Sequence, residues 1–140
     1  MKRQENPLKN QKGFTLIEII AVLVILGILA AVAVPKYMDL QNEARIKSAE
    51  AAMAEVKSRL SNGYAIYLLA NNGAAPKDVK AICAEVNDAN TLPKTGAGDV
   101  PMGSDYKVTL SYTTTTATIT VNQVQGVAVT GVSAKWVIPS

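Results

Sequence analysis

Hydrophobic residues are concentrated near the start of the chain. Residues 14–34 form an apolar run that is interrupted only by Thr15, Glu18 and Gly27. A helix rises about 1.5 Å per residue, so a run of this length covers roughly 31 Å, about the hydrocarbon thickness of one bilayer. The pattern therefore predicts one membrane-spanning helix.

Positive charge lies on the N-terminal side of this run. Lys and Arg are in excess before residue 14, and only Lys36 follows closely, so the N-terminus should stay in the cytoplasm and the rest should be translocated. Two other interpretations are a secretory signal cleaved after Ala33 and a plain signal anchor. The run is long for a cleaved signal. Neither alternative explains Glu18, whose carboxylate costs on the order of 2.5 kcal/mol or more at a bilayer centre and less near an end.

A single apolar stripe continues at helical spacing beyond Pro35. Its members recur at three- and four-residue steps; they are Ile46, Ala49, Met53, Val56, Leu60, Tyr64 and Tyr67. On the polar side, Glu43 precedes Lys47 and Glu55 precedes Arg59 by four positions, the favourable order for ion pairs within a helix.

The spanning run and the stripe together predict one long helix over residues 14–71. It would contain about 58 residues and extend roughly 87 Å. Asn71, Asn72 and Gly73 predict its end. Pro35 lacks a backbone donor and is expected to kink or loosen the helix.

Shorter elements are predicted for residues 72–140. Pro76 is expected in the first turn of a short helix whose apolar face is Val79, Ile82, Cys83 and Val86, and residues 87–104 have the composition of a loop. Three or four antiparallel strands are expected, at residues 106–112, 118–121, 127–130 and 135–138. The stripe of the long helix can cover their apolar face. The predicted fold class is therefore α+β, a long N-terminal helix packed against a small antiparallel sheet.

The net charge of +3 belongs to the first thirteen residues. Residues 14–140 hold ten Lys or Arg and ten Asp or Glu side chains, so a chain without residues 1–13 has no net field that attracts phosphates, and nucleic-acid binding is not predicted. The chain has no histidine and one cysteine. This inventory excludes Cys/His metal clusters, His-dependent triads and an intrachain disulfide, and no enzyme is predicted.

Residues 12–18 read Lys-Gly-Phe-Thr-Leu-Ile-Glu and are followed by 16 residues without a charge and then by Pro35. This pattern resembles the N-terminus of type IV pilins and the related pseudopilins, closely over residues 12–39 and in architecture beyond them. The resemblance implies the pilin fold and a basic leader, residues 1–13. It also implies that a membrane aspartyl prepilin peptidase cuts between Gly13 and Phe14 and methylates the new amine of Phe14.

Physical reasons can be given for the residues of this pattern. Gly13 leaves the scissile bond uncrowded. Glu18 supplies a buried charge that the Phe14 ammonium of a neighbouring subunit can neutralise, worth about 4 kcal/mol at 4 Å and an effective dielectric near 20 before desolvation is subtracted. The pair would set the axial register of packed helices. Gly27 and Pro35 are assembly candidates, because together they would let the helix melt locally in a filament. The plainer interpretations are a solvated Glu18 at the end of an ordinary anchor and a simple kink at Pro35.

The resemblance implies a structural subunit of a surface filament that serves adhesion, motility, DNA uptake or a similar task. It would lie in the inner membrane and then in an extracellular pilus. Its partners would be copies of itself in a helical homopolymer, the membrane, the peptidase, and an assembly platform with assembly and retraction ATPases. One alternative is a type II secretion pseudopilin in a short periplasmic filament, although no acidic calcium-binding C-terminal segment is visible. The other is a signal-anchored head that binds a ligand or does chemistry.

Three further groups of residues differ from the pilin pattern or invite a function. Many pilins close a C-terminal loop with a disulfide, which a lone Cys83 cannot do; we expect a small core residue, with an intermolecular bridge as the alternative. Asp88, Asp99 and Asp105 are weak candidates for Ca²⁺, but their spacing follows no known loop. No cofactor is therefore predicted, and solvated loop charges are expected.

Three tyrosines lie along the predicted long helix. Tyr37, Tyr64 and Tyr67 are expected to pack between the helix and the head. An aromatic path for charge, proposed for some pilins, is the alternative role.

Overall fold

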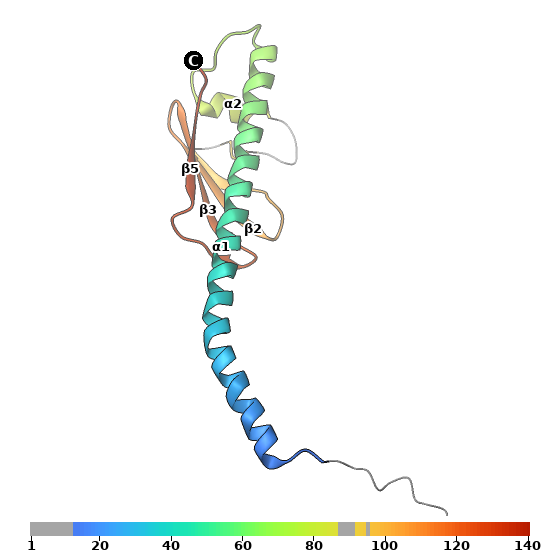
Figure 1. Ribbon diagram of the computed structural model, residues 1–140. Helices are drawn as coiled ribbons and strands as arrows, with labels where there is room; N and C mark the ends of the chain where they lie inside the picture. Colours follow the sequence, from blue (N-terminus) through green and yellow to red (C-terminus); the bar gives the residue numbers. More distant parts are fainter. Residues whose placement is uncertain (1–12, 87–91, 95) are drawn as a thin grey trace, which may run out of the picture. The chain divides into compact units, whose positions relative to one another are not determined.

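The computed structural model describes residues 13–86, 92–94 and 96–140. These residues form α1 (Leu16–Ala70), α2 (Val79–Glu85), β1 (Ala97–Val100), β2 (Tyr106–Tyr112), β3 (Thr116–Val124), β4 (Val127–Ala128) and β5 (Ser133–Val137), as Figure 1 shows. The chain divides into two compact units, Met1–Leu40 and Gln41–Ser140, and α1 contributes to both. The predicted α+β class is confirmed.

α1 is a single helix of 55 residues. It begins two residues later and ends one residue earlier than predicted. The helix continues through Pro35, so the missing donor does not interrupt the backbone of the single subunit, and the expected loosening is not present there. At the other end, Asn72 and Gly73 have positive φ angles of 53° and 85°. The Gly73 amide donates to the Leu68 carbonyl at 2.7 Å, which caps the helix as the sequence predicts.

The five strands found among the described residues form one antiparallel sheet in the order β1-β2-β3-β4. β4 pairs with the C-terminal end of β3, whereas β5 pairs with its N-terminal part, from Thr116 opposite Val137 to Thr120 opposite Ser133. The prediction of three or four strands was wrong because β1 lies inside the predicted loop. Its sequence, Ala-Gly-Asp-Val, has no apolar alternation, and backbone pairing with β2 holds it in place.

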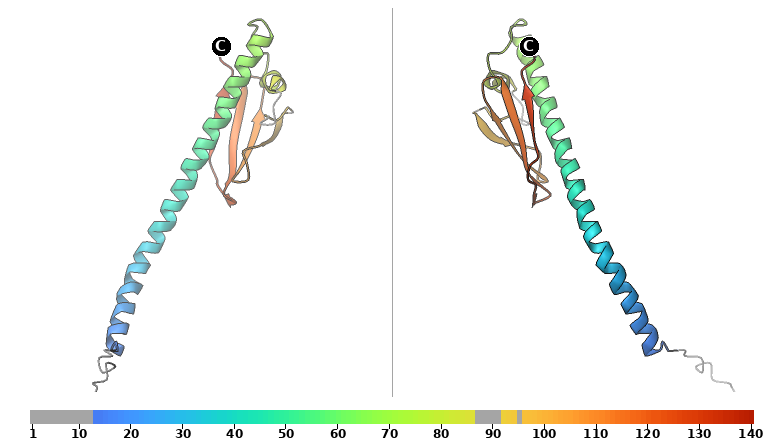
Figure 2. Two further views of the ribbon diagram at one scale, coloured as in Figure 1. Left: turned by 90° about the vertical axis from the view of Figure 1, so that its right-hand side faces the viewer. Right: turned by 60° about the vertical axis from the view of Figure 1, so that its left-hand side comes forward.

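The core lies between one face of this sheet and the part of α1 in the second unit (Figure 2). α1 contributes Ala49, Ala52, Met53, Val56, Leu60 and Gly63 as buried residues. Of the predicted stripe, Ile46 is 40% exposed and was placed wrongly. Ala52 and Gly63 were missed. Their small size lets the backbone of α1 lie close to its neighbours.

α2 begins later than expected. Its N-cap is Asp78, whose Oδ1 accepts a hydrogen bond from the Ala81 amide at 2.8 Å, so Pro76 lies before the helix instead of in its first turn. Val79, Ile82 and Cys83 are buried as predicted.

The two ion pairs of the described residues both lie on α1. Glu55 and Arg59 pair at 2.9 Å as predicted. Lys47 pairs with Glu50 at 3.1 Å instead of the predicted Glu43. Both candidates are within one turn of Lys47, so helical spacing alone did not decide between them.

Candidate functional site

α1 begins with a reciprocal hydrogen-bonded cap formed by Thr15 and Glu18. Glu18 Oε2 accepts from the Thr15 amide at 2.8 Å and from Thr15 Oγ1 at 2.9 Å. The Glu18 amide donates to Thr15 Oγ1 at 3.3 Å. This is a capping box, which satisfies amide groups that the first turn of a helix otherwise leaves without partners. The Glu18 carboxylate therefore has two donors in its own chain.

Gly13 and Phe14 lie just before this cap, outside the helix. The Phe14 side chain is 84% exposed, and a Cβ added to Gly13 would meet nothing within 4 Å. The peptide bond between Gly13 and Phe14 is therefore uncrowded in the single chain.

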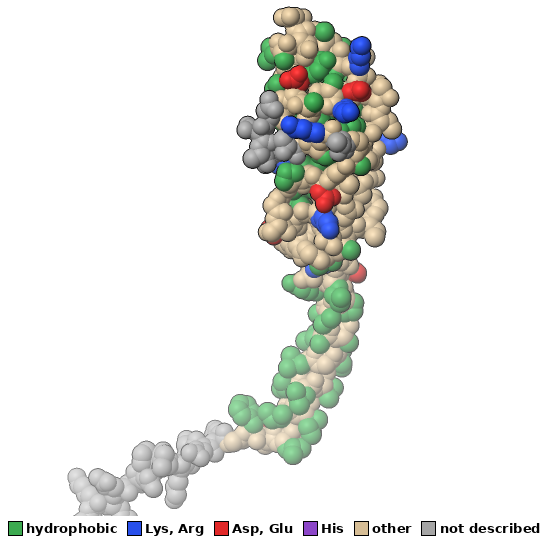
Figure 3. Space-filling model, turned by 180° about the vertical axis from the view of Figure 1, so that it is seen from behind, with side chains coloured by type: hydrophobic (Ala, Val, Ile, Leu, Met, Phe, Trp, Pro, Cys, Tyr) green, Lys and Arg blue, Asp and Glu red, His purple; other side chains and the backbone are tan. Residues whose placement is uncertain are grey.

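The N-terminal part of α1 carries a continuous apolar surface. Every residue from 13 to 40 is exposed, and Figure 3 shows hydrophobic side chains along this segment. The helix is long and apolar enough to cross a membrane, with a mean hydropathy of 3.0 in its most apolar window. Gly27 lies within this surface, and nothing lies within 4 Å of a Cβ added there. An apolar surface of this extent requires lipid or protein against it.

Two of the three weak candidates for Ca²⁺, Asp99 and Asp105, lie among the described residues. Asp99 on β1 accepts from Thr109 Oγ1 at 3.4 Å, and Asp105 accepts from Ser104 Oγ at 3.4 Å. Asp88 lies outside the described residues. In residues 13–86, 92–94 and 96–140, no three His, Cys, Asp or Glu side chains form a group that could hold a metal ion.

Cys83 is a free, fully buried thiol on α2. Burial, and secondarily the nearby charge of Asp78, raises its pKa to about 11. A neutral, enclosed thiol is a poor nucleophile. The placement agrees with the expected core residue and not with an intermolecular bridge.

The three tyrosines do not share one environment. Tyr64 packs against the core and its hydroxyl donates to the Pro139 carbonyl at 3.4 Å, as expected for a contact between helix and head. Tyr67 is half-buried, whereas Tyr37 is 64% exposed, so the packing role predicted for it is not seen in the single chain.

Known proteins place this chain in a family. Residues 8–34 match the family described as "Prokaryotic N-terminal methylation motif". Over 112 residues the chain is 35% identical to the "Type IV narrow pilus major component PilA5" of Thermus thermophilus, an alignment that covers 80% of this chain and 87% of that protein. The chain belongs to the type IV pilins.

Other type IV pilins are similar over shorter stretches. This pilin is 44% identical over 68 residues to "Type IV major pilin protein PilE" of Neisseria gonorrhoeae, covering 49% of this chain and 38% of that protein. It is 36% identical over 73 residues to a "Fimbrial protein" of Pseudomonas aeruginosa, covering 52% and 47%. The chain thus spans less than half the length of these two relatives. No solved structure matches it.

The predicted site residues of this pilin lie just before α1 and along it. Gly13, Phe14 and Glu18 lie together at its start, while Gly27 and Pro35 follow nine and seventeen residues after Glu18. From the sequence, Glu18 was paired with a neighbouring subunit, with a solvated side chain as the plainer interpretation, and its bonds to Thr15 were missed. The signal was present, because Thr-x-x-Glu before an apolar run is the sequence pattern of a capping box.

Proposed function

We propose that this pilin is the structural subunit of a type IV pilus, held in the inner membrane by residues 14–34 before assembly and packed through them in the filament afterwards. The observation that carries the proposal is the apolar surface of residues 14–34, none of which is buried in the single chain. Two environments can cover it in turn, the bilayer and the helices of other copies. The Thermus thermophilus relative is a major component of a type IV pilus, which supports the same role.

The processing step proposed for this chain is cleavage between Gly13 and Phe14 by a prepilin peptidase, followed by methylation of the Phe14 amine. The matched methylation motif spans this position. Cleavage removes a segment whose side chains carry a net charge of +3 and which would hold the uncleaved chain at the anionic cytoplasmic face. The cut frees an amine on Phe14, four residues before Glu18.

Glu18 is proposed to serve the subunit at both stages. In the membrane, the two hydrogen bonds from Thr15 lower the cost of a carboxylate near the bilayer edge. In the filament, the Phe14 ammonium of a neighbouring subunit would supply a positive charge to the Glu18 carboxylate. Thr15 offers only neutral hydrogen-bond donors. Because an unpaired carboxylate among apolar helices is costly, the pair favours one axial offset between subunits.

Gly27 and Pro35 are proposed to let the helix loosen during assembly. Pro35 removes one intrahelical hydrogen bond, and glycine is a weak helix former. The remaining partners are expected to be an assembly platform and its ATPases, which would move subunits between membrane and filament.

Mass spectrometry of protein sheared from the surface of native cells tests the proposal. We expect intact and N-terminal peptide masses of a chain that begins at N-methylated Phe14. A chain that keeps Met1, or one cut after Ala33, would contradict the pilus assignment. A methylated chain found only with the cell envelope would instead indicate a pseudopilin.

Two substitutions of Glu18 test its charge and its role in the capping box separately. Glu18→Ala removes both, whereas Glu18→Gln keeps a side chain that can complete the capping box. We expect both variants to be cleaved and both to give few or no surface filaments, counted in sheared fractions. Normal filaments from Glu18→Gln would show that the cap suffices, and normal filaments from Glu18→Ala would exclude the register role.

A further inference from the structure

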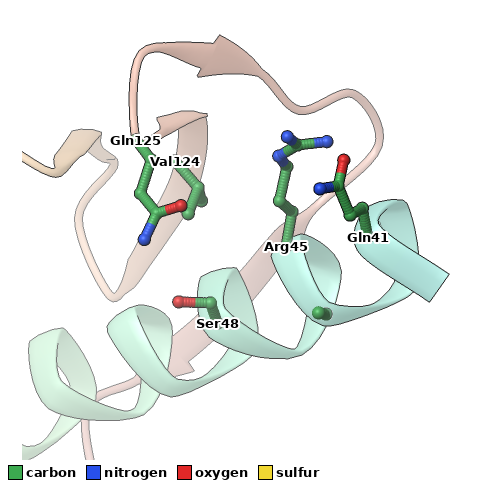
Figure 4. Close-up of a pocket in the computed structure, with 6 residues that line it drawn as sticks. Gln41, Arg45, Ser48, Val124 and Gln125 are labelled. Atoms are coloured by element: carbon green, nitrogen blue, oxygen red, sulfur yellow. The ribbon is translucent and has the colours of Figure 1, made fainter. Parts of the chain in front are cut away.

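A hollow of about 260 Å³ lies in the second unit, where the first turns of its helix face the end of β3. It is lined by Gln41, Ala44, Arg45, Ser48, Val124 and Gln125. In Figure 4, Gln41 and Arg45 project from α1 on the same side, and Gln125 faces them from the turn after β3. A second hollow of about 180 Å³ also has Arg45 in its wall, beside β4. Arg45 is the one charged side chain that lines either hollow.

The guanidinium of Arg45 has no anionic partner among the described residues. Its Nη1 donates to the neutral Asn42 Oδ1 at 3.2 Å. The side chains three and four positions away on α1 carry no carboxylate. Lys47 and Arg59, by contrast, each pair with a glutamate of the same helix. Arg45 therefore presents an uncompensated cation to the hollow.

The position of Arg45 along the chain places it near a bilayer surface. Lys36 and Tyr37 follow the spanning run after Pro35, and aromatic and basic residues mark the edges of membrane helices. Arg45 comes eight residues after Tyr37, about 12 Å of helix. Arg45 donates to Asn42, three residues nearer the N-terminus, and long basic side chains close to the end of a spanning run can extend toward the lipid interface.

The surroundings of Arg45 are amphipathic. Ile46 and Val127, in the wall of the second hollow, are 40% and 41% exposed. The first hollow has the side-chain amides of Gln41 and Gln125 in its wall. Ser48 adds a hydroxyl, which is hydrogen-bonded to the Tyr106 hydroxyl at 2.8 Å. A cation with polar donors on one side and exposed apolar groups on the other matches the boundary between lipid headgroups and acyl chains.

We propose that the larger hollow, lined by Gln41, Arg45 and Gln125, binds the phosphate of a phospholipid headgroup while the subunit is anchored in the membrane. The lipid would belong to the leaflet on the translocated side, where residues 41–140 lie. Guanidinium groups bind phosphate oxygens through two parallel hydrogen bonds, and Gln41 and Gln125 lie where they can donate further ones. The contact sets the depth of residues 41–48 at the interface and is broken when the subunit leaves the bilayer. The inference rests on the membrane-anchored stage of the proposed function.

The test is a solid-state NMR measurement of dipolar dephasing between guanidinium ¹⁵N and lipid ³¹P in frozen vesicles of phosphatidylethanolamine and phosphatidylglycerol. The full chain is used, with Arg3→Lys in every sample so that Arg45 and Arg59 are its only arginines. We expect up to half of the guanidinium signal to dephase. Dephasing should be lost in Arg45→Gln and in Arg45→Lys, and retained in Arg59→Gln, the matched control on the same helix.

Several outcomes would overturn the inference. No dephasing in the parent chain, or unchanged dephasing in Arg45→Gln, would show that Arg45 does not hold a phosphate. Equal dephasing with inorganic phosphate in micelles of a phosphate-free detergent would assign the site to the free ion. Failed filament assembly of Arg45→Gln together with no phosphorus contact would assign Arg45 to a neighbouring subunit.

Two controls keep the result interpretable. Unchanged emission of Trp136, the one tryptophan, shows that a variant is folded. Flotation with the vesicles separates the two proposals: a chain that does not float contradicts the membrane stage of the proposed function, whereas a chain that floats without dephasing contradicts only the Arg45 site.

Discussion

Single residues in this pilin illustrate how a polar group is kept in an apolar setting. Glu18 lies at the edge of a spanning run and has two hydrogen bonds from Thr15 within its own first turn. Both residues belong to one short motif, so the arrangement is encoded locally. The proposed ammonium partner of a neighbouring subunit would therefore meet a carboxylate that already has two hydrogen bonds within its own chain.

Cys83 illustrates the opposite case, an ionisable group that the fold keeps neutral. Its pKa is raised from 9.0 to about 11, so the folded state holds the thiol proton over a pH range in which the unfolded chain releases it. The resulting stabilisation is fully present below pH 9 and is lost as the pH rises toward 11. We expect the free energy of unfolding to fall by about 2 kcal/mol over this range from Cys83 alone.

Urea unfolding at several pH values measures this effect. Lysines and tyrosines also titrate above pH 9, so the quantity to compare is the difference between the parent and Cys83→Ala, which should shrink between pH 9 and pH 11. A difference that is independent of pH would contradict the raised pKa. Alkylation of Cys83 at pH 8 should require unfolding.

At the scale of elements, α1 and α2 meet at a glycine. A Cβ added to Gly63 would lie 2.8 Å from Val86 Cγ2 and 3.0 Å from Ile82 Cγ2. Both contacts are methyl groups of β-branched side chains, which have little rotational freedom to move aside. The close approach of the two helices therefore depends on the absence of a side chain at this position.

Gly63→Leu is expected to destabilise the head by about 1–3 kcal/mol through overpacking, partly offset by the better helix propensity of leucine. Ala65→Leu is the matched control, since Ala65 is exposed on the same helix and its substitution should change stability by less than about 0.5 kcal/mol. Chemical denaturation followed by Trp136 fluorescence measures both. Equal stability of the two variants would show that α2 moves away without cost.

Strand β1 was not predicted because its sequence has no alternation of apolar and polar residues. Val100 is its one buried residue, and its register, Val100 opposite Val108, comes from backbone bonds with β2. β2 itself was predicted with its correct bounds, because its residues alternate between core and solvent. A strand at the edge of a sheet can be held by its partner without an apolar pattern of its own.

At the scale of the whole molecule, the two units differ in what covers their apolar residues. Residues 13–40 have no buried side chain, whereas the core cluster lies entirely between Ala49 and Trp136. Folding of the head therefore uses no residue of the first unit. The first unit instead requires lipid or other subunits.

A chain that begins at Gln41 is accordingly expected to fold by itself. It should be monomeric without detergent, unfold cooperatively, and show the Trp136 emission of the full chain, because the Trp136 indole still donates to Ser61 Oγ. Gel filtration and thermal unfolding measure these properties, with the full chain in detergent as the control. Aggregation or loss of the Trp136 emission would show that residues before 41 contribute to the fold.

The sequence alone determined the long apolar segment, the continuous helix, the N-terminal methylation motif, the charge of the first thirteen residues and the alternating strand β2. Each of these depends on composition or periodicity within a short window. Only the tertiary structure decided that Ile46 is exposed while Ala52 and Gly63 are buried, that β1 joins the sheet, and that Arg45 lines a hollow without an anion. These features depend on segments far apart in the chain, whose contacts leave no local pattern for a sequence to show.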